Sequence, residues 1–211
     1  SSSTIDTMMI DIDGGDKAYQ QIIKDPKHNV TKTGNATLIG KDGTILETKM
    51  DSIKGRGNAT WLREKKPFSI KLSEKTSVFG MNEAKKWILL SNYPDGSLSR
   101  NAVFFTLAKE LGLSYTPEFR PVDLYINHKY IGSYLLTSKV EVSESRVDNN
   151  NNYLFELENH PVGSEIKLKS GNLYTVHNPD LTSLSSSEKT KARKEIKKLL
   201  DHMEDLMKSK Y

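Results

Sequence analysis

A glycine-containing loop followed by a lysine-bearing segment is the part of this sequence best suited to bind an anion. Residues 53–61 read IKGRGNATW, and residues 65–72 read KKPFSIKL. Glycine lets backbone N–H groups approach an anion closely, because it carries no side chain that would intervene. If the second segment is a strand, Ser69 and Lys71 share one of its faces. The other face then carries the apolar residues Phe68, Ile70 and Leu72.

Two interpretations of this pattern stay open. Protein kinases cover the phosphates of ATP with a glycine-rich loop and clamp them with a lysine on a nearby strand. The loop here has Gly55 and Gly57, but Thr60 stands where the third glycine of such loops would be. By spacing alone, the pattern is more typical of a tight turn followed by a surface lysine.

Other catalytic and metal-binding patterns are missing from the sequence. There is no cysteine, which excludes a thiolate zinc site and a cysteine nucleophile. The five histidines show no metal-binding spacing, and neither a G-x-S-x-G elbow nor a P-loop occurs. Residues 11–16 (DIDGGD) do not fit a helix–loop–helix calcium loop, because Gly15, Asp16 and Ile22 stand at key ligand and turn positions. We therefore assign no metal ligand and no catalytic residue from motifs.

Composition and charge limit the classes of partner. The chain has 211 residues and a formal net charge of +4, and most of the surplus lies in residues 188–211. Proteins that bind nucleic acid usually present a basic face on the folded body, so we expect no specific nucleic-acid partner. No apolar run approaches the roughly 20 residues of a membrane-spanning helix, so we expect no membrane span.

The hydrophobic pattern predicts an α+β fold with a mainly antiparallel sheet, a central helix and a C-terminal helix. Residues 37–46 predict a hairpin, because Asp42 and Gly43 supply the positive φ that a tight turn needs. A second hairpin is expected over residues 122–136. Residues 97–111 predict the central helix, with apolar residues along much of one side.

The apolar segments predict one core shared by sheet and helices. It should contain Trp87, Ile88, Leu89, Leu124, Ile126, Leu135 and Phe155. The terminal helix, from about residue 187 to 207, has one apolar face opposite a charged face. We expect it to pack on the body through Ile196, Leu199, Met203 and Leu206.

Longer stretches of the sequence resemble the CotH family, the spore-coat H proteins and their relatives. The segments that carry the resemblance lie in order over about residues 50–158: GRGNATW, KKPFSIKL, KKWILLSNYPDGSLSRNAVFFTLAKELGL, YTPEFRPVDLYINHKYIGSYLLTSKVEVSESRVD and YLFELE. CotH proteins are similar to a distant branch of the protein kinase-like fold. The resemblance implies that the sheet forms the N-terminal part of such a fold. It also implies phosphoryl transfer from ATP, with a divalent metal such as Mg, to Ser of partner proteins.

The resemblance further implies which residues contact the nucleotide. The residues that match the family's nucleotide-covering loop are Gly55, Arg56, Gly57 and Asn58. Lys71 would clamp the phosphates, with Lys66 as the alternative. Glu141 follows the second hairpin, where kinase-like folds join their lobes and edge the adenine pocket.

The acidic residues that a kinase needs do not occur in the expected motif. The family carries a Trp-Asp-x-Asp-like segment, whereas neither Trp61 nor Trp87 is followed by aspartate. We expect the Mg ligands to lie outside these 211 residues and leave open whether the chain is an enzyme. Residues 1–184 should form a sheet-rich CotH-like domain with a hinge near 137–148, and residues 185–211 should begin a helical lobe.

Two functions follow as alternatives. The first is the ATP-binding lobe of a CotH-like protein Ser kinase that acts on coat or surface proteins. The second is a non-catalytic module of the CotH fold that binds a protein or polysaccharide partner. Related modules occur on spores, on bacterial cell surfaces and in secreted systems, so we expect an extracellular, cell-surface or spore-surface location.

Overall fold

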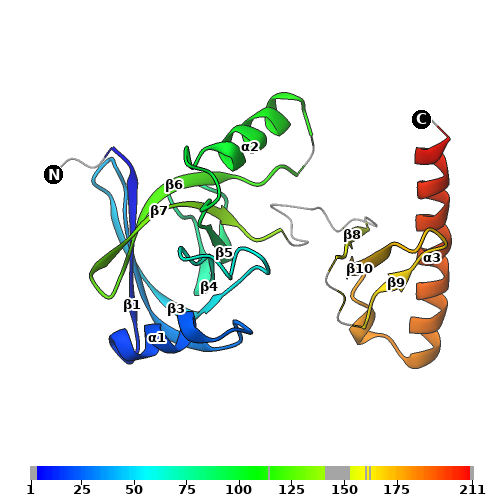
Figure 1. Cartoon of the computed structure of the whole chain (residues 1–211), viewed down its shortest axis with the longest axis horizontal. Helices are drawn as coiled ribbons and strands as arrows, with labels where there is room; N and C mark the ends of the chain where they lie inside the picture. Colours follow the sequence, from blue (N-terminus) through cyan, green and yellow to red (C-terminus); the bar gives the residue numbers. More distant parts are fainter. Residues whose placement is uncertain (1–3, 114, 141–152, 160, 162, 210–211) are drawn as a thin grey trace. The chain divides into compact units, whose positions relative to one another are not determined.

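A computed structural model describes residues 4–113, 115–140, 153–159, 161 and 163–209. The chain divides into two compact units, residues 1–139 and 140–211 (Figure 1). Each unit has its own hydrophobic core.

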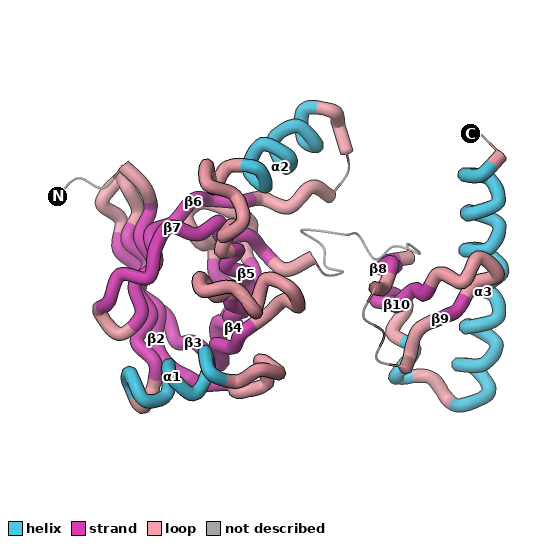
Figure 2. The backbone as a smooth tube through the Cα atoms, in the orientation of Figure 1, coloured by secondary structure: helices cyan, strands magenta, loops and turns pink. Residues whose placement is uncertain are grey.

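Seven strands of the first unit form a closed β-barrel (Figure 2). They are β1 (Asp6–Ile12), β2 (Thr31–Ile39), β3 (Ile45–Gly55), β4 (Phe68–Thr76), β5 (Ala84–Leu90), β6 (Phe119–Ile126) and β7 (Lys129–Ser138). Their order around the barrel is β1-β2-β3-β4-β5-β7-β6. All neighbours pair antiparallel except β1 and β6, which run parallel and close the barrel.

Alternating apolar residues fill the barrel interior. On β4, Phe68, Ile70 and Leu72 point inward, and Ser69 and Lys71 lie on the outer face between them, as the sequence pattern predicts. The following eight side chains, from five strands, are at most 2 % exposed: Met8, Ile10, Ile53, Phe68, Ile70, Leu72, Leu89 and Leu124. The barrel is thus a packed core, and any ligand contact has to be made at its ends or its outer surface.

Both predicted hairpins are present. Gly43 has a φ of 87° in the turn between β2 and β3, which is the conformation expected of the Asp-Gly pair. Asn127 and His128, at φ 48° and 66°, make the two-residue turn between β6 and β7. Two consecutive positive φ values are typical of a tight turn whose twist matches that of the flanking strands.

The two helices of the first unit differ in how much they bury. Helix α1 (Gly15–Lys24) packs against β1, β2 and β3, with Ile22 fully buried. Helix α2 (Arg100–Glu110), the predicted central helix, has no buried residue. Its apolar side chains are largely in contact with solvent, and Phe104 is 73 % exposed. The apolar stripe predicted for α2 is therefore covered only in part: Ala102, Phe105 and Ala108 are half-buried, whereas Leu107 and Leu111 are 51 and 68 % exposed.

The second unit joins a small sheet to a long helix. Its elements are β8 (Leu154–Leu157), β9 (Ile166–Lys167), β10 (Leu173–Asn178), a short 3₁₀ turn at Leu181–Ser183 and α3 (Ser186–Lys208). The sheet order is β8-β10-β9, all antiparallel. Ser185 and Glu188 form a reciprocal capping box that fixes where α3 begins.

The face by which α3 packs differs from the predicted one. Ile196 and Leu200 are buried in the core of the second unit. Leu199, Met203 and Leu206, which we expected to pack, are 44, 37 and 50 % exposed. The buried face of α3 is shifted by about one residue from the face predicted from the sequence. The hydrophobic pattern did not reveal the shift, because the polar residues Asp201 and Glu204 are also buried on this face.

The single predicted core is in fact two. Trp87, Leu89, Leu124, Ile126 and Leu135 are buried in the first unit, as expected, while Ile88 is only half-buried. Phe155 packs against the separate core of the second unit.

The fold class is confirmed as α+β, with a mostly antiparallel sheet. The closure of that sheet into a barrel was not predicted. The division into two units after residue 139 lies earlier in the chain than the domain boundary expected after residue 184. The expected domain boundary stays a prediction. Among the described helices, none has both the length and the apolar character needed to cross a membrane.

Candidate functional site

The loop between β3 and β4, residues 56–67, carries a tryptophan that is buried in the core of the first unit. Trp61 is 3 % exposed and packs edge-on against Phe68, with ring centroids 6.4 Å apart. Its indole N–H donates to the carbonyl oxygen of Asp25, directly after α1, at 2.8 Å. The loop is therefore anchored on the side that faces the core.

Gly55, the last residue of β3, and Gly57, in the loop, have local structural roles. A β-carbon on Gly55 would overlap the indole ring of Trp61, so only glycine leaves room for the buried ring. Gly57 has a φ of 83°, in the left-handed region that favours glycine. The loop glycines thus allow a tight turn over a tryptophan, which is the tight-turn interpretation left open by the sequence.

Part of the loop backbone remains available to a ligand. The N–H of Arg56 donates to the carbonyl oxygen of Pro67 at 3.2 Å. Asn58 is exposed, and its carbonyl oxygen accepts from the N–H of Trp61 at 3.1 Å. Within the described part of the chain, the N–H groups of Gly57 and Asn58 donate to no protein acceptor.

The ammonium groups of Lys65 and Lys66 each lie over an aromatic ring of the first unit. The ammonium of Lys66 donates to the carbonyl oxygen of Trp61 at 2.6 Å and lies 5.1 Å from that tryptophan's ring centroid. The ammonium of Lys65 donates to the carbonyl oxygen of Ser133 on β7 and lies 4.6 Å from the ring centroid of Tyr134. Both side chains are half-buried, and neither pairs with a carboxylate among the residues that the structure describes.

Burial changes the ionisation of this cluster. Desolvation lowers the pKa of Lys65. The adjacent Tyr134 is buried, and desolvation raises the pKa of its hydroxyl, which donates to the carbonyl oxygen of Lys66 at 2.9 Å. Lys65 thus carries a partly desolvated charge that is balanced only by a carbonyl dipole and an aromatic face, an arrangement that favours binding of an external anion.

Lys71 lies elsewhere. It stands on the outer face of β4, where its ammonium is 3.2 Å from the carboxylate of Asp51 on β3, and both side chains are more than 40 % exposed. Gly55 pairs with Phe68, three residues before Lys71 along β4, so the lysine is displaced by about 10 Å from the loop. The structure brings the loop together with Lys66 and not with Lys71.

Two further expectations concern Glu141 and the Mg ligands, which we expected to lie outside this chain. Glu141 lies outside the described residues. No three His, Asp or Glu side chains come close enough to hold a metal ion in the described ranges. The described residues therefore do not fit a Mg site of carboxylate ligands.

Lys65 was the residue that sequence reasoning underrated. The sequence resemblance assigns the phosphate contact to Lys71 or Lys66 and gives no role to Lys65, which precedes the strand. Its position depends on Gly132, whose lack of a side chain leaves space for the lysine stem; a β-carbon there would lie 3.2 Å from the Lys65 Cε. The Gly-Ser-Tyr sequence at 132–134 could have pointed to this contact. However, the hydrogen bond joins Lys65 to Ser133, 68 residues away, so no local pattern links the two.

The comparison with known families adds the last observation. The family model described as CotH kinase protein matches residues 53–211. No curated protein shows a significant match to the chain. The matched region begins in β3, just before the loop, and covers more than half of the chain. The protein therefore belongs to the CotH family.

Proposed function

We propose that this chain supplies the phosphate-binding part of an ATP-dependent protein Ser kinase of the CotH type. Membership of a family described as CotH kinase protein is the observation that carries the proposal. Coat or surface proteins are the proposed Ser-bearing substrates, at a spore or cell surface. The kinase-like character of the barrel is part of the same proposal.

The proposed contacts centre on the loop and its two lysines. The N–H groups of Gly57 and Asn58, which have no protein acceptor in the described ranges, would donate to phosphate oxygens. The ammonium groups of Lys65 and Lys66 have N–H groups to spare, because each makes one hydrogen bond to a carbonyl oxygen. Lys71 would contribute little, since Asp51 already balances its charge.

Magnesium is not assigned to any residue described here. The described residues provide no cluster of carboxylates for it, so the proposal concerns nucleotide binding by this chain and not phosphoryl transfer by it. We expect no detectable transfer by residues 1–211 alone.

Calorimetric titration with ATP and magnesium tests the proposal. Wild type should bind, and Lys66→Ala should raise the dissociation constant by roughly ten- to a hundredfold, because each charge-assisted hydrogen bond contributes about 1.5–3 kcal/mol. Lys65→Ala should weaken binding by a similar factor. Lys71→Ala and the control Lys49→Ala, an exposed lysine of β3, should change it by less than about twofold.

The results separate the proposal from its main alternative. No binding by wild type would reject a nucleotide site and favour a non-catalytic module. Loss of binding on Lys71→Ala alone would place the phosphates on the outer face of β4 and contradict the arrangement proposed for the loop.

A further inference from the structure

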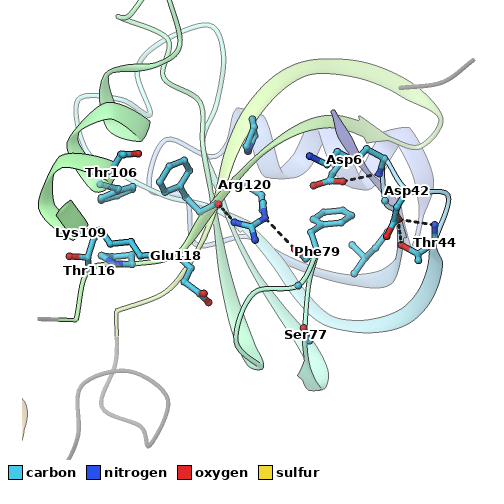
Figure 3. A pocket seen from close by; sticks show the side chains of 18 of the residues that line it. Asp6, Asp42, Thr44, Ser77, Phe79, Thr106, Lys109, Thr116, Glu118 and Arg120 are labelled. Carbon is cyan, nitrogen blue, oxygen red and sulfur yellow. Dashed lines mark hydrogen bonds between the residues drawn. The ribbon is translucent and has the colours of Figure 1, made fainter. Parts of the chain in front are cut away.

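A groove of about 1170 Å³ lies on the first unit, away from the loop and its lysines (Figure 3). Its walls come from α2, from the turn between β2 and β3, from residues 77–80 and from the start of β6. Figure 3 shows Arg120 between Phe79 on one side and the end of α2 on the other. None of the features discussed for nucleotide binding lines this groove.

Arg120 is fixed in place by two backbone carbonyl groups. Its Nε donates to the carbonyl oxygen of Phe79 at 3.2 Å, and its Nη1 donates to that of Phe119 at 2.9 Å. A guanidinium has five N–H groups, so three remain without a protein acceptor among the described residues. The side chain is half-buried, and its geometry is therefore set before any ligand arrives.

Three of the carboxylates that line the groove accept hydrogen bonds from groups other than Arg120. Asp6, 9 % exposed, accepts the N–H of Lys41 at 2.9 Å. Asp42 accepts from the N–H of Thr44 at 3.0 Å and from its hydroxyl at 2.7 Å. Glu118 accepts the N–H of Asn82 at 2.6 Å. In the described residues no carboxylate forms an ion pair with Arg120, although four line the groove.

Three phenylalanines also line the groove, at Phe79, Phe105 and Phe119. The ring of Phe105 on α2 lies 5.7 Å from that of Phe119 on β6, at an interplanar angle of 38°. Phe79 lines the opposite side and is only half-buried. A fixed guanidinium between apolar rings matches a ligand that combines one planar anion with an apolar group.

We propose that this groove binds a peptide segment in which one carboxylate side chain stands next to large apolar side chains. A single carboxylate can accept two parallel hydrogen bonds from Arg120, and its apolar neighbours can cover the three phenylalanines. A polyanion such as ATP is a poorer match, because the groove offers one fixed guanidinium, and its four carboxylates are nearly balanced by Lys41, Lys109 and Arg120. This inference does not depend on nucleotide binding elsewhere on the chain.

The test uses a fluorescein-labelled, end-capped peptide with a central phenylalanine–glutamate–leucine triplet in a glycine–serine frame. Fluorescence polarisation with the whole 211-residue chain should show saturable binding. The same peptide with glutamine in place of glutamate should bind at least about tenfold more weakly, since one charge-assisted pair is lost. Alanine in place of both apolar residues should also weaken binding.

The protein side of the test uses Arg120→Gln and Arg120→Lys. Gln should reduce affinity for the glutamate peptide to that of the glutamine peptide, and Lys should restore it only in part, because it lacks the planar fork. Amide NMR signals that shift on peptide addition should cluster in residues 77–80 and at Phe119 and Arg120.

Several results would overturn the proposal. They are equal binding of the glutamate and glutamine peptides to wild type, NMR shifts confined to other residues, or ATP competing with the peptide at this groove. The comparison of the two peptides uses unaltered protein, so it stands even if Arg120→Gln disturbs the fold.

Discussion

Trp61 donates its indole N–H to the carbonyl oxygen of Asp25, 2.8 Å away, and so ties the loop before β4 to the end of α1. The carboxylate of Asp25 in turn accepts the N–H groups of Lys27, Asn29 and Val30 at 3.0, 2.5 and 2.8 Å. These bonds lower the pKa of Asp25, with the bond from Val30 contributing most. The tryptophan of the GRGNATW segment is thus a structural anchor that holds the proposed phosphate-binding loop against the barrel.

Gly55→Ala should destabilise the barrel. The added methyl group would overlap the indole ring of Trp61, and crowding of this kind in a packed core costs about 1–3 kcal/mol. Urea unfolding followed by tryptophan fluorescence measures the loss, because both tryptophans of the chain, Trp61 and Trp87, are buried in the first unit.

Gly96→Ala is the control. Its β-carbon would meet no atom within 4 Å, so we expect a change within about 0.5 kcal/mol. Equal effects of the two substitutions would contradict the packing of Trp61 against Gly55.

Two neighbouring leucines of α3 test the packing face of that helix. Leu200 is 0 % exposed and Leu199 is 44 % exposed. Leu200→Ala should cost the second unit roughly 2–5 kcal/mol, as large-to-small changes in cores do, whereas Leu199→Ala should cost much less. Thermal unfolding followed by circular dichroism at the helix band compares the two variants directly. A larger loss for Leu199→Ala would restore the face that the sequence suggested.

Acid should weaken the attachment of α3 to its sheet. Hydrogen bonds from the side chains of Ser170 and Asn172 lower the pKa of Glu204, and the N–H of Lys169, 2.9 Å away, lowers that of Asp201. A carboxyl group with a lowered pKa in the folded state stabilises the fold above its ordinary pKa of about 4. That stability is lost as the pH falls through the lowered folded-state value. We therefore expect the second unit to lose stability progressively below about pH 4.

Urea unfolding at several pH values, followed by circular dichroism, measures this dependence. The Glu204→Gln variant should be less stable than wild type at pH 7 and should lose less stability on acidification, because its side chain does not titrate. An unchanged pH dependence in that variant would show that Glu204 does not link protonation to unfolding.

Local patterns predicted much of the fold. The inward and outward faces of β4 follow from strict alternation at residues 68–72, and the turns at Gly43 and Asn127 follow from residues that tolerate positive φ. The barrel closure did not follow, because the parallel pairing of β1 with β6 joins segments far apart in sequence. Nothing in the local sequence of either strand indicates with which strand it will pair.

The candidate site was predicted in part, for the same reason. The loop and Lys66 lie close together because they are close in the sequence. Alternation correctly put Lys71 opposite the apolar face, but it could not reveal that this face points to solvent and that Asp51 is the partner. The role of Lys65 depends on β7, and that of Arg120 depends on Phe79, 41 residues away.

The parallel pairing of β1 with β6 has a consequence for the order in which the barrel can fold. The consecutive strands from β1 to β5 can pair as soon as they are synthesised, but the second edge of β1 must wait for β6, which begins at residue 119. Until then the growing sheet keeps unpaired strand edges, and late pairing between distant segments makes folding slow. The region matched by the family model begins at residue 53, so β1 and β2 lie before it. A version of the protein trimmed to that region would lose the strands that close the barrel and would expose the edges most prone to aggregation.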